Sequence, residues 1–173
     1  MRALFLTTLL VLLAGCASQK IFTEHDPGTD FGAYRSFAWI APHPLLVPAA
    51  AVVHPQMETY LMASTRANLE ARGYAFASAP GAAQFLVGFA VGTPVGVDAA
   101  AYPADVAEKL IWRPASSSAD GARWLKIDVY DASTRAPVWR GTVRRDITGR
   151  DQANAEAVVR GVVDDVLAGF PPG

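Results

Sequence analysis

The chain has 173 residues, enough for one domain and a short additional segment but too few for two full domains. Hydrophobic residues make up 51% of it and charged residues only 18%, which excludes an intrinsically disordered chain. The net charge of −1 argues against a nucleic-acid-binding protein, which normally carries a basic excess, and a single cysteine excludes a scaffold held by intramolecular disulfides.

The first sixteen residues have the pattern of a bacterial lipoprotein export signal. Arg2 supplies a positive charge, and residues 3–13 form an apolar stretch that is too short to span a bilayer, for which about 20 residues are needed. The following Leu13-Ala14-Gly15-Cys16 resembles a lipobox, where a diacylglycerol is attached to the cysteine thiol, the chain is cut before the cysteine, and the new amine is acylated. We therefore predict removal of residues 1–15 and lipidation of Cys16. The alternative is an ordinary secretory signal with a chance cysteine at its cleavage site.

The same segment predicts where the protein resides. In proteobacterial lipoproteins an Asp after the cysteine resembles an inner-membrane retention signal, but Ala17 stands there. We therefore expect an outer-membrane lipoprotein that faces the periplasm of a Gram-negative host. The expected organisation is a lipidated tether over residues 16–19 and a single domain over 20–173. If residues 20–24 form a strand, residues 17–19 span about 10 Å at most and hold the domain close to the membrane.

The first half of the domain is expected to contain two strands and a helix. The strands cover residues 20–24 and 34–40, and between them Asp30 is expected to cap a short helical turn. An Ala-rich loop over 45–53 precedes a helix over 55–72, whose apolar residues share one stripe and which ends before a glycine.

The second half contains the clearest local pattern in the chain. Residues 84–91 alternate as a strand, and residues 123–130 and 138–147 form a hairpin that directs Leu125, Ile127 and Val129 inward. A further short strand is expected over 108–113 and an amphipathic helix over 151–169. The expected fold class is α+β: a mostly antiparallel sheet of about five strands packed against two helices.

No group of residues has the pattern of a catalytic or metal site. His25, His43 and His54 lack a helical i, i+4 spacing, so a zinc site would need ligands gathered from three loops. There is no Gly-x-Ser-x-Gly elbow and no phosphate-binding loop. Asp128 and Asp131 lie at a strand end and need not converge, and Asp131 is expected to accept hydrogen bonds in the turn. We therefore predict a protein that is not an enzyme and that carries no cofactor besides the acyl chains at Cys16.

Lys126, Arg140 and Arg144 are the candidate binding residues. They lie on the two strands of the hairpin, and Arg140 and Arg144 fall on one face of their strand. One interpretation is a solvated strand face whose charges prevent aggregation. The other is a small basic patch that contacts lipid phosphates or an anionic glycan.

The mature chain as a whole resembles the "domain of unknown function 4136" family of bacterial lipoproteins. The motifs that carry the resemblance are Asp30-Phe31-Gly32-Ala33-Tyr34-Arg35-Ser36-Phe37-Ala38-Trp39, Gly73-Tyr74, Phe85-Leu86-Val87, Leu125-Lys126-Ile127-Asp128-Val129-Tyr130-Asp131, Val138-Trp139-Arg140-Gly141 and Phe170-Pro171-Pro172. One departure is Gln84, where the family usually has an Asp. The resemblance implies a fold and an envelope location, and no activity.

Together these observations predict a lipid-anchored envelope protein with a non-catalytic binding or structural role. Its expected partners are the membrane, through the lipid anchor, and an envelope protein or an anionic glycan or lipid. The alternative, from another functional class, is an envelope enzyme that acts on lipids or glycans.

Overall fold

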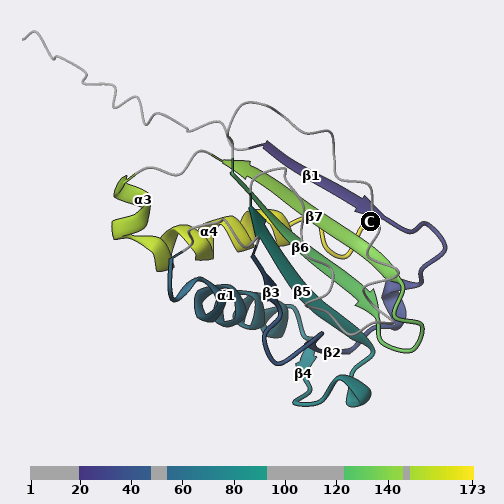
Figure 1. The fold of residues 1–173 in the computed structure, drawn as a ribbon. Helices are drawn as coiled ribbons and strands as arrows, with labels where there is room; N and C mark the ends of the chain where they lie inside the picture. The colour runs from purple at the N-terminus through teal and green to yellow at the C-terminus, as the bar shows by residue number, and fades with distance from the viewer. Residues whose placement is uncertain (1–19, 48–53, 93–122, 146–148) are drawn as a thin grey trace, which may run out of the picture.

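One mixed sheet and the helices on one of its faces make up the fold (Figure 1). The computed structural model describes residues 20–47, 54–92, 123–145 and 149–173. The strands are β1 (Lys20–His25), β2 (Ser36–Trp39), β3 (Leu45–Leu46), β4 (Ala75–Phe76), β5 (Phe85–Gly92), β6 (Arg123–Asp131) and β7 (Pro137–Arg145). The helices are α1 (Met57–Ala71), α3 (Gly149–Ala153) and α4 (Ala155–Leu167), with short 3-10 turns at Phe31–Ala33 and Pro80–Ala82.

The strand order is β1-β7-β6-β5-β2-β4, and β3 pairs with β5 beyond the end of β2. The four long strands β1, β7, β6 and β5 are antiparallel neighbours, whereas β2, β3 and β4 make parallel pairs. The expected α+β class is therefore confirmed, but within the described residues the sheet has seven strands instead of about five, and it is mixed instead of mostly antiparallel. The parallel pair of β2 and β4 follows from the chain path, because α1 lies between them as a crossover connection.

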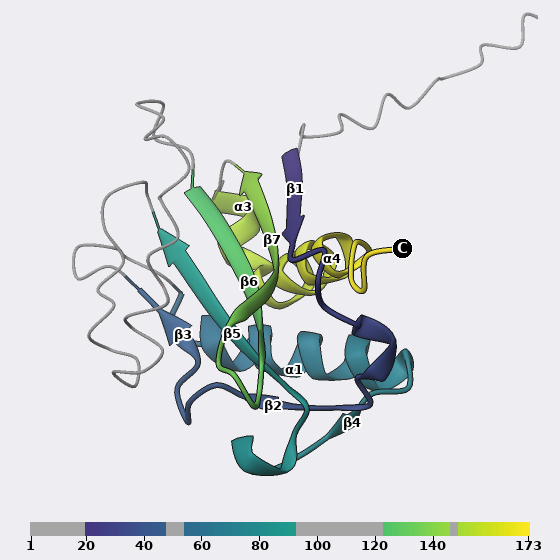
Figure 2. The same cartoon turned by 90° about the vertical axis from the view of Figure 1, so that its right-hand side faces the viewer.

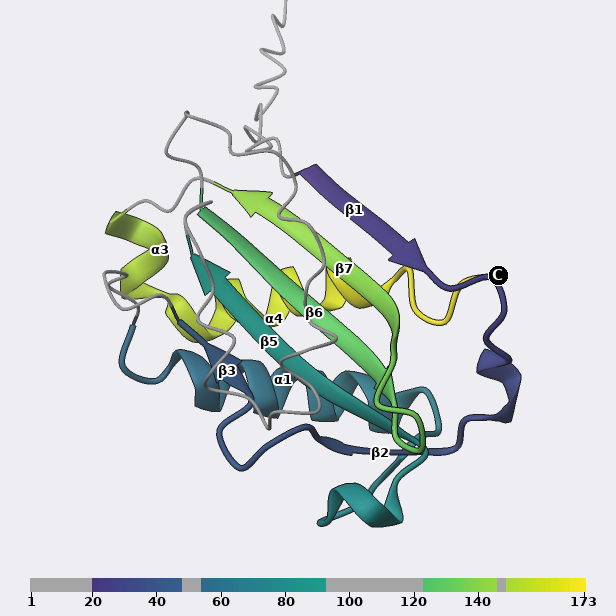
Figure 3. The same ribbon diagram turned by 45° about the vertical axis from the view of Figure 1, so that its right-hand side comes forward.

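The two long helices cover one face of the sheet, as Figure 2 shows from the side. The main core lies between them and the strands, and it contains Phe85, Val87 and Phe89 of β5 and Ile127 and Val129 of β6. The sequence directs Ile127 and Val129 inward together with Leu125, which packs against this core while partly buried, so this prediction is confirmed. Residues 84–91 form the predicted strand, but every residue of β5 is buried, so both of its faces are packed. In the view of Figure 3, α4 crosses behind β5, β6 and β7.

The end of α4 is fastened to the sheet and to α1 by side chains from distant parts of the chain. The Trp139 indole Nε1 donates a hydrogen bond to the Gly169 carbonyl at 3.1 Å, and Phe170 is buried beside it. From the end of α1, the Arg72 guanidinium donates to the carbonyls of Leu167 and Phe170. Leu167 is the last residue of α4 and Phe170 follows the helix, so neither carbonyl has a partner within the helix.

Most predicted elements are found with shifted ends. The first strand begins at Lys20 as expected and continues to His25, and Asp30 caps the 3-10 turn by accepting a hydrogen bond from the Gly32 amide at 3.0 Å. The predicted final helix is two helices, because the chain turns at Asn154 between α3 and α4.

The expected strand over 108–113, the export signal, Cys16 and the tether lie outside the described residues. In the part of the chain that the structure describes, no helix has the length and apolarity needed to cross a bilayer.

Candidate binding surface

The sheet face opposite α1 and α4, here called the second face, carries the predicted basic residues. Along β6, Trp124, Lys126, Asp128 and Tyr130 alternate with the core residues and therefore belong to this face. Its β5 side is apolar and buried around Leu86. Toward β7 and β1 it becomes polar, and β1 is exposed along its whole length.

Arg140 forms an ion pair with Asp128 on the second face. Its Nε donates to Oδ1 at 2.5 Å and its Nη2 to Oδ2 at 3.0 Å, and both side chains are less than a tenth exposed. Burial lowers the pKa of Arg140, but the charge and hydrogen bonds of Asp128 outweigh this and raise it. The Asp128 carboxylate therefore compensates most of the charge that the sequence assigns to Arg140.

Lys126 lies between the two arginines in the register of the hairpin. It stands opposite Thr142, so Arg140 and Arg144 are its diagonal neighbours on β7. Its ammonium nitrogen lies 4.6 Å from the centroid of the Trp124 ring. Burial lowers the pKa of Lys126, and the charge of Arg140 lowers it further, against the opposing charges of Asp128 and Glu24. The structure thus brings the three predicted basic residues together on one face.

Asp131 has a different role from Asp128 and lies apart from it, in the hairpin turn. Its Oδ1 accepts hydrogen bonds from the backbone amides of Ser133 (3.0 Å) and Thr134 (2.8 Å), and its Oδ2 accepts one from the Tyr34 hydroxyl (3.0 Å). Partial burial raises the pKa of this carboxyl, but the hydrogen bonds outweigh burial and lower the pKa to about 2. The expected turn role of Asp131 is therefore found.

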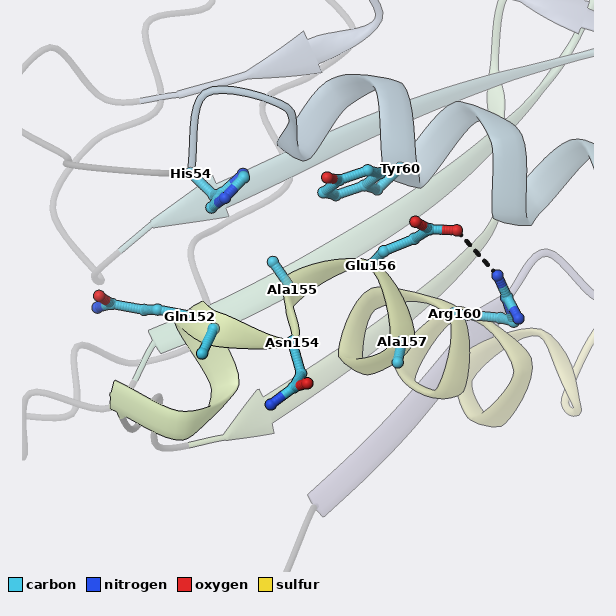
Figure 4. Close-up of a pocket in the computed structure, with 9 residues that line it drawn as sticks. His54, Tyr60, Gln152, Asn154, Ala155, Glu156, Ala157 and Arg160 are labelled. Carbon is cyan, nitrogen blue, oxygen red and sulfur yellow. Dashed lines mark hydrogen bonds and ion pairs between the residues drawn. The ribbon is translucent and has the colours of Figure 1, made fainter.

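A recess of about 440 Å³ lies elsewhere, where the start of α1 meets the junction of α3 and α4 (Figure 4). Sequence reasoning did not predict this recess, because its walls come from segments about a hundred residues apart. Glu156, the one carboxylate among the described lining residues, pairs with Arg160 at 3.0 Å, and Tyr60 donates a hydrogen bond to Gln56. Within the described ranges, no three His, Cys, Asp or Glu residues are grouped to hold a metal ion.

The fold and this surface define a small α+β domain with helices on one sheet face and a buried ion pair on the other. The chain matches the model of the family "Domain of unknown function (DUF4136)" over residues 21–172. The protein therefore belongs to this family, as the sequence motifs predict. Among curated proteins, none matches the chain.

Solved structures share the fold at low sequence identity. A DUF4136 family protein from Bacteroides thetaiotaomicron has a TM-score of 0.59 and 14% identity, covering 88% of this chain and 96% of that one. A PDZ domain protein from Parabacteroides distasonis has a TM-score of 0.54 and 14% identity, over 91% of this chain but 37% of its own. A PelC variant from Paraburkholderia phytofirmans, described as a dodecamer, has a TM-score of 0.51 and 18% identity, over 87% and 96%. These similarities concern the fold.

Proposed function

We propose that the protein is a non-catalytic, lipid-anchored envelope protein that binds an anionic envelope component through the second face of its sheet. Residues 1–15 are the export signal, and Cys16 carries the acyl chains on the periplasmic side of the outer membrane. Lys126 and Arg144 are the main ligand-binding residues. Arg140 attracts the anion only weakly, because its charge is paired with that of Asp128.

The environment of Lys126 is the observation that carries the binding proposal. The ammonium is half-buried and lies near the Arg140 guanidinium. These two effects outweigh the opposing charges of Asp128 and Glu24 and lower the pKa of Lys126, so they disfavour its charged form. An anion bound beside Lys126 relieves this cost, because it supplies the opposite charge where solvent is partly excluded. A surface lysine in full solvent gains much less from such a ligand. The site is therefore predisposed to bind an anion and to hold its proton more firmly once the anion is bound.

Replacement of Cys16 tests the anchor. In Cys16→Ala, we expect the loss of palmitate labelling and the release of the protein into the periplasmic fraction, because the thiol is the attachment point of the lipid. Cys16→Ala protein that remains in the outer membrane would contradict lipid anchoring.

Replacement of Lys126 tests the binding surface. The probe is alginate, an anionic polysaccharide, with uncharged dextran as the ligand control, and binding is measured on immobilised full-length protein. We expect Lys126→Gln to weaken alginate binding about tenfold, the loss of one charge-assisted contact. Arg66→Gln on α1 removes one exposed positive charge far from the second face and should leave binding unchanged. Equal losses in the two variants would mean that alginate responds only to net charge, and the proposed surface would be wrong.

A further inference from the structure

The start of β1 is apolar, exposed and basic at the same time. Ile21 and Phe22 are the exposed large hydrophobic residues of the described chain, with 39% and 53% of their surface accessible. They are neighbours on an edge strand, so their side chains point to opposite faces of the sheet and both border its rim. The rim of the sheet is therefore apolar on both sides at the start of β1.

Covalent geometry places this strand near the proposed anchor. Four peptide steps separate Cys16 from Lys20, and a fully extended chain covers about 14 Å in that distance. Whatever path residues 17–19 take, the first residue of β1 cannot lie farther from Cys16. Ile21 and Phe22 follow immediately, at about 3.3 Å per residue along the strand. A lipid on Cys16 therefore restricts these two side chains to the neighbourhood of the bilayer surface.

Positive charge is present at the same end of the sheet. Lys20 stands opposite Arg144 in the register of β1 and β7, and Arg145 follows at the end of β7, where it pairs with Asp151 at 2.6 Å. Figure 3 shows that β1 begins beside the tip of β7, while the turn between β6 and β7 lies at the other end of the sheet. Apolar side chains beside lysine and arginine are the composition of protein surfaces that lie in a lipid interface, because the apolar groups enter the acyl boundary and the cations meet phosphates.

We propose that Lys20, Ile21, Phe22 and Arg144 form a membrane-contact surface that rests on the phospholipid leaflet carrying the anchor. This inference builds on the proposed lipidation of Cys16 and adds an orientation to it. The acyl chains hold the protein at the membrane, and the contact at β1 stops the domain from tumbling on its tether. The hairpin turn after Asp131 then points away from the bilayer, and the second face stands at an angle to it with Arg144 at the boundary.

Photo-cross-linking to lipid tests the contact. The photoreactive residue p-benzoylphenylalanine, a phenylalanine that carries an additional benzoyl group, replaces the exposed Phe22 or Ala67, which is exposed on α1. The protein is expressed in its host, extracted from whole cells with detergent and reconstituted in vesicles of phosphatidylethanolamine and phosphatidylglycerol. Mass spectrometry establishes whether Cys16 carries acyl chains. Protein without them is coupled through the Cys16 thiol to a maleimide-bearing phospholipid, so that the contact is measured in every case.

We expect about tenfold more phospholipid adduct from position 22 than from position 67. Similar yields from both positions in membrane-tethered protein would overturn the membrane-contact surface. Acyl chains on Cys16 with similar yields would leave the anchor proposal intact and refute only the contact. A bare Cys16 with a high yield from position 22 after maleimide coupling would support the contact and refute the lipid anchor.

Discussion

Arg140 on β7 reaches across the hairpin to Asp128 on β6 and binds both of its carboxylate oxygens. The strands hold the two residues directly opposite each other. A register shift between Val129 and Tyr130 lies close by, where β7 takes up one additional residue. An ion pair with this geometry can form in only one pairing of the strands, so we infer that it specifies the hairpin register beside the irregularity.

Removal of one partner of this pair should be more damaging than removal of both. Asp128→Ala leaves the charge of Arg140 buried without its carboxylate, and we expect a loss of about 3–5 kcal/mol in the free energy of unfolding. The double variant Asp128→Leu with Arg140→Met fills the same space without charge and should lose far less. Urea denaturation of the variants measures both values. A double variant that loses as much stability as Asp128→Ala would show that the two residues do not act as a pair.

The Asp131 carboxylate should make the protein less stable in acid. Its pKa is about 2 in the folded chain and about 3.9 in an unfolded one. Because the folded pKa is the lower one, the stabilisation is complete above about pH 4 and disappears as the pH falls toward 2. The carboxylate is partly exposed, so we expect a contribution of only about 1 kcal/mol. Urea unfolding of wild-type protein and Asp131→Asn should differ at neutral pH and converge near pH 2; a constant difference would contradict the assignment.

The elements with a long repeating pattern could be predicted, and the short ones could not. Residues 84–91 and the hairpin alternate over enough positions to reveal their inner faces, and the stripes of α1 and α4 repeat at helical spacing. β3 and β4 have two residues each, which is too short for any period. β4 pairs with β2 because α1 returns the chain to the sheet, and β3 pairs with β5 because the chain after β2 comes back to the same strand. Such long-range pairing leaves no local signal.

The candidate surface shows the same limit at the level of single side chains. Alternation along the strand is enough to place Arg140 and Arg144 on one face, but the register between the strands is needed to place Lys126 on the same face. The ion pair of Arg140 with Asp128 depends on the register between strands, and the irregularity after Val129 changes that register near the turn. In the sequence the nearest acidic neighbour of Asp128 is Asp131, whereas its partner in the fold is Arg140 across the hairpin.

Two glycine substitutions should change stability in opposite directions. A Cβ on Gly141 would collide with the side chains of Val166 and Trp139, so we expect Gly141→Ala to lower the free energy of unfolding by about 1–3 kcal/mol. Gly161 lies inside α4 with open space at its Cβ position, and Gly161→Ala should raise it by about 0.5–1 kcal/mol. Thermal and urea unfolding measure both. A neutral Gly141→Ala would mean that α4 does not approach β7 as closely as the structure shows.

Lys126→Met should separate stability from ligand binding. Burial and the charge of Arg140 lower the pKa of Lys126, so the folded protein holds the ammonium at a cost. Methionine keeps an unbranched side chain over Trp124 without the charge, and we expect it to raise the free energy of unfolding at neutral pH by up to about 1 kcal/mol.

The folded pKa of Lys126 lies below the unfolded value of about 10.4, so wild-type stability should rise with pH between the two values and the advantage of the variant should shrink. Urea unfolding of both proteins at neutral pH and near pH 10 tests this, with alginate binding measured in parallel. A variant that is less stable at neutral pH would show that the contact of the ammonium with Trp124 outweighs its burial, and the argument for an anion site at Lys126 would lose its basis.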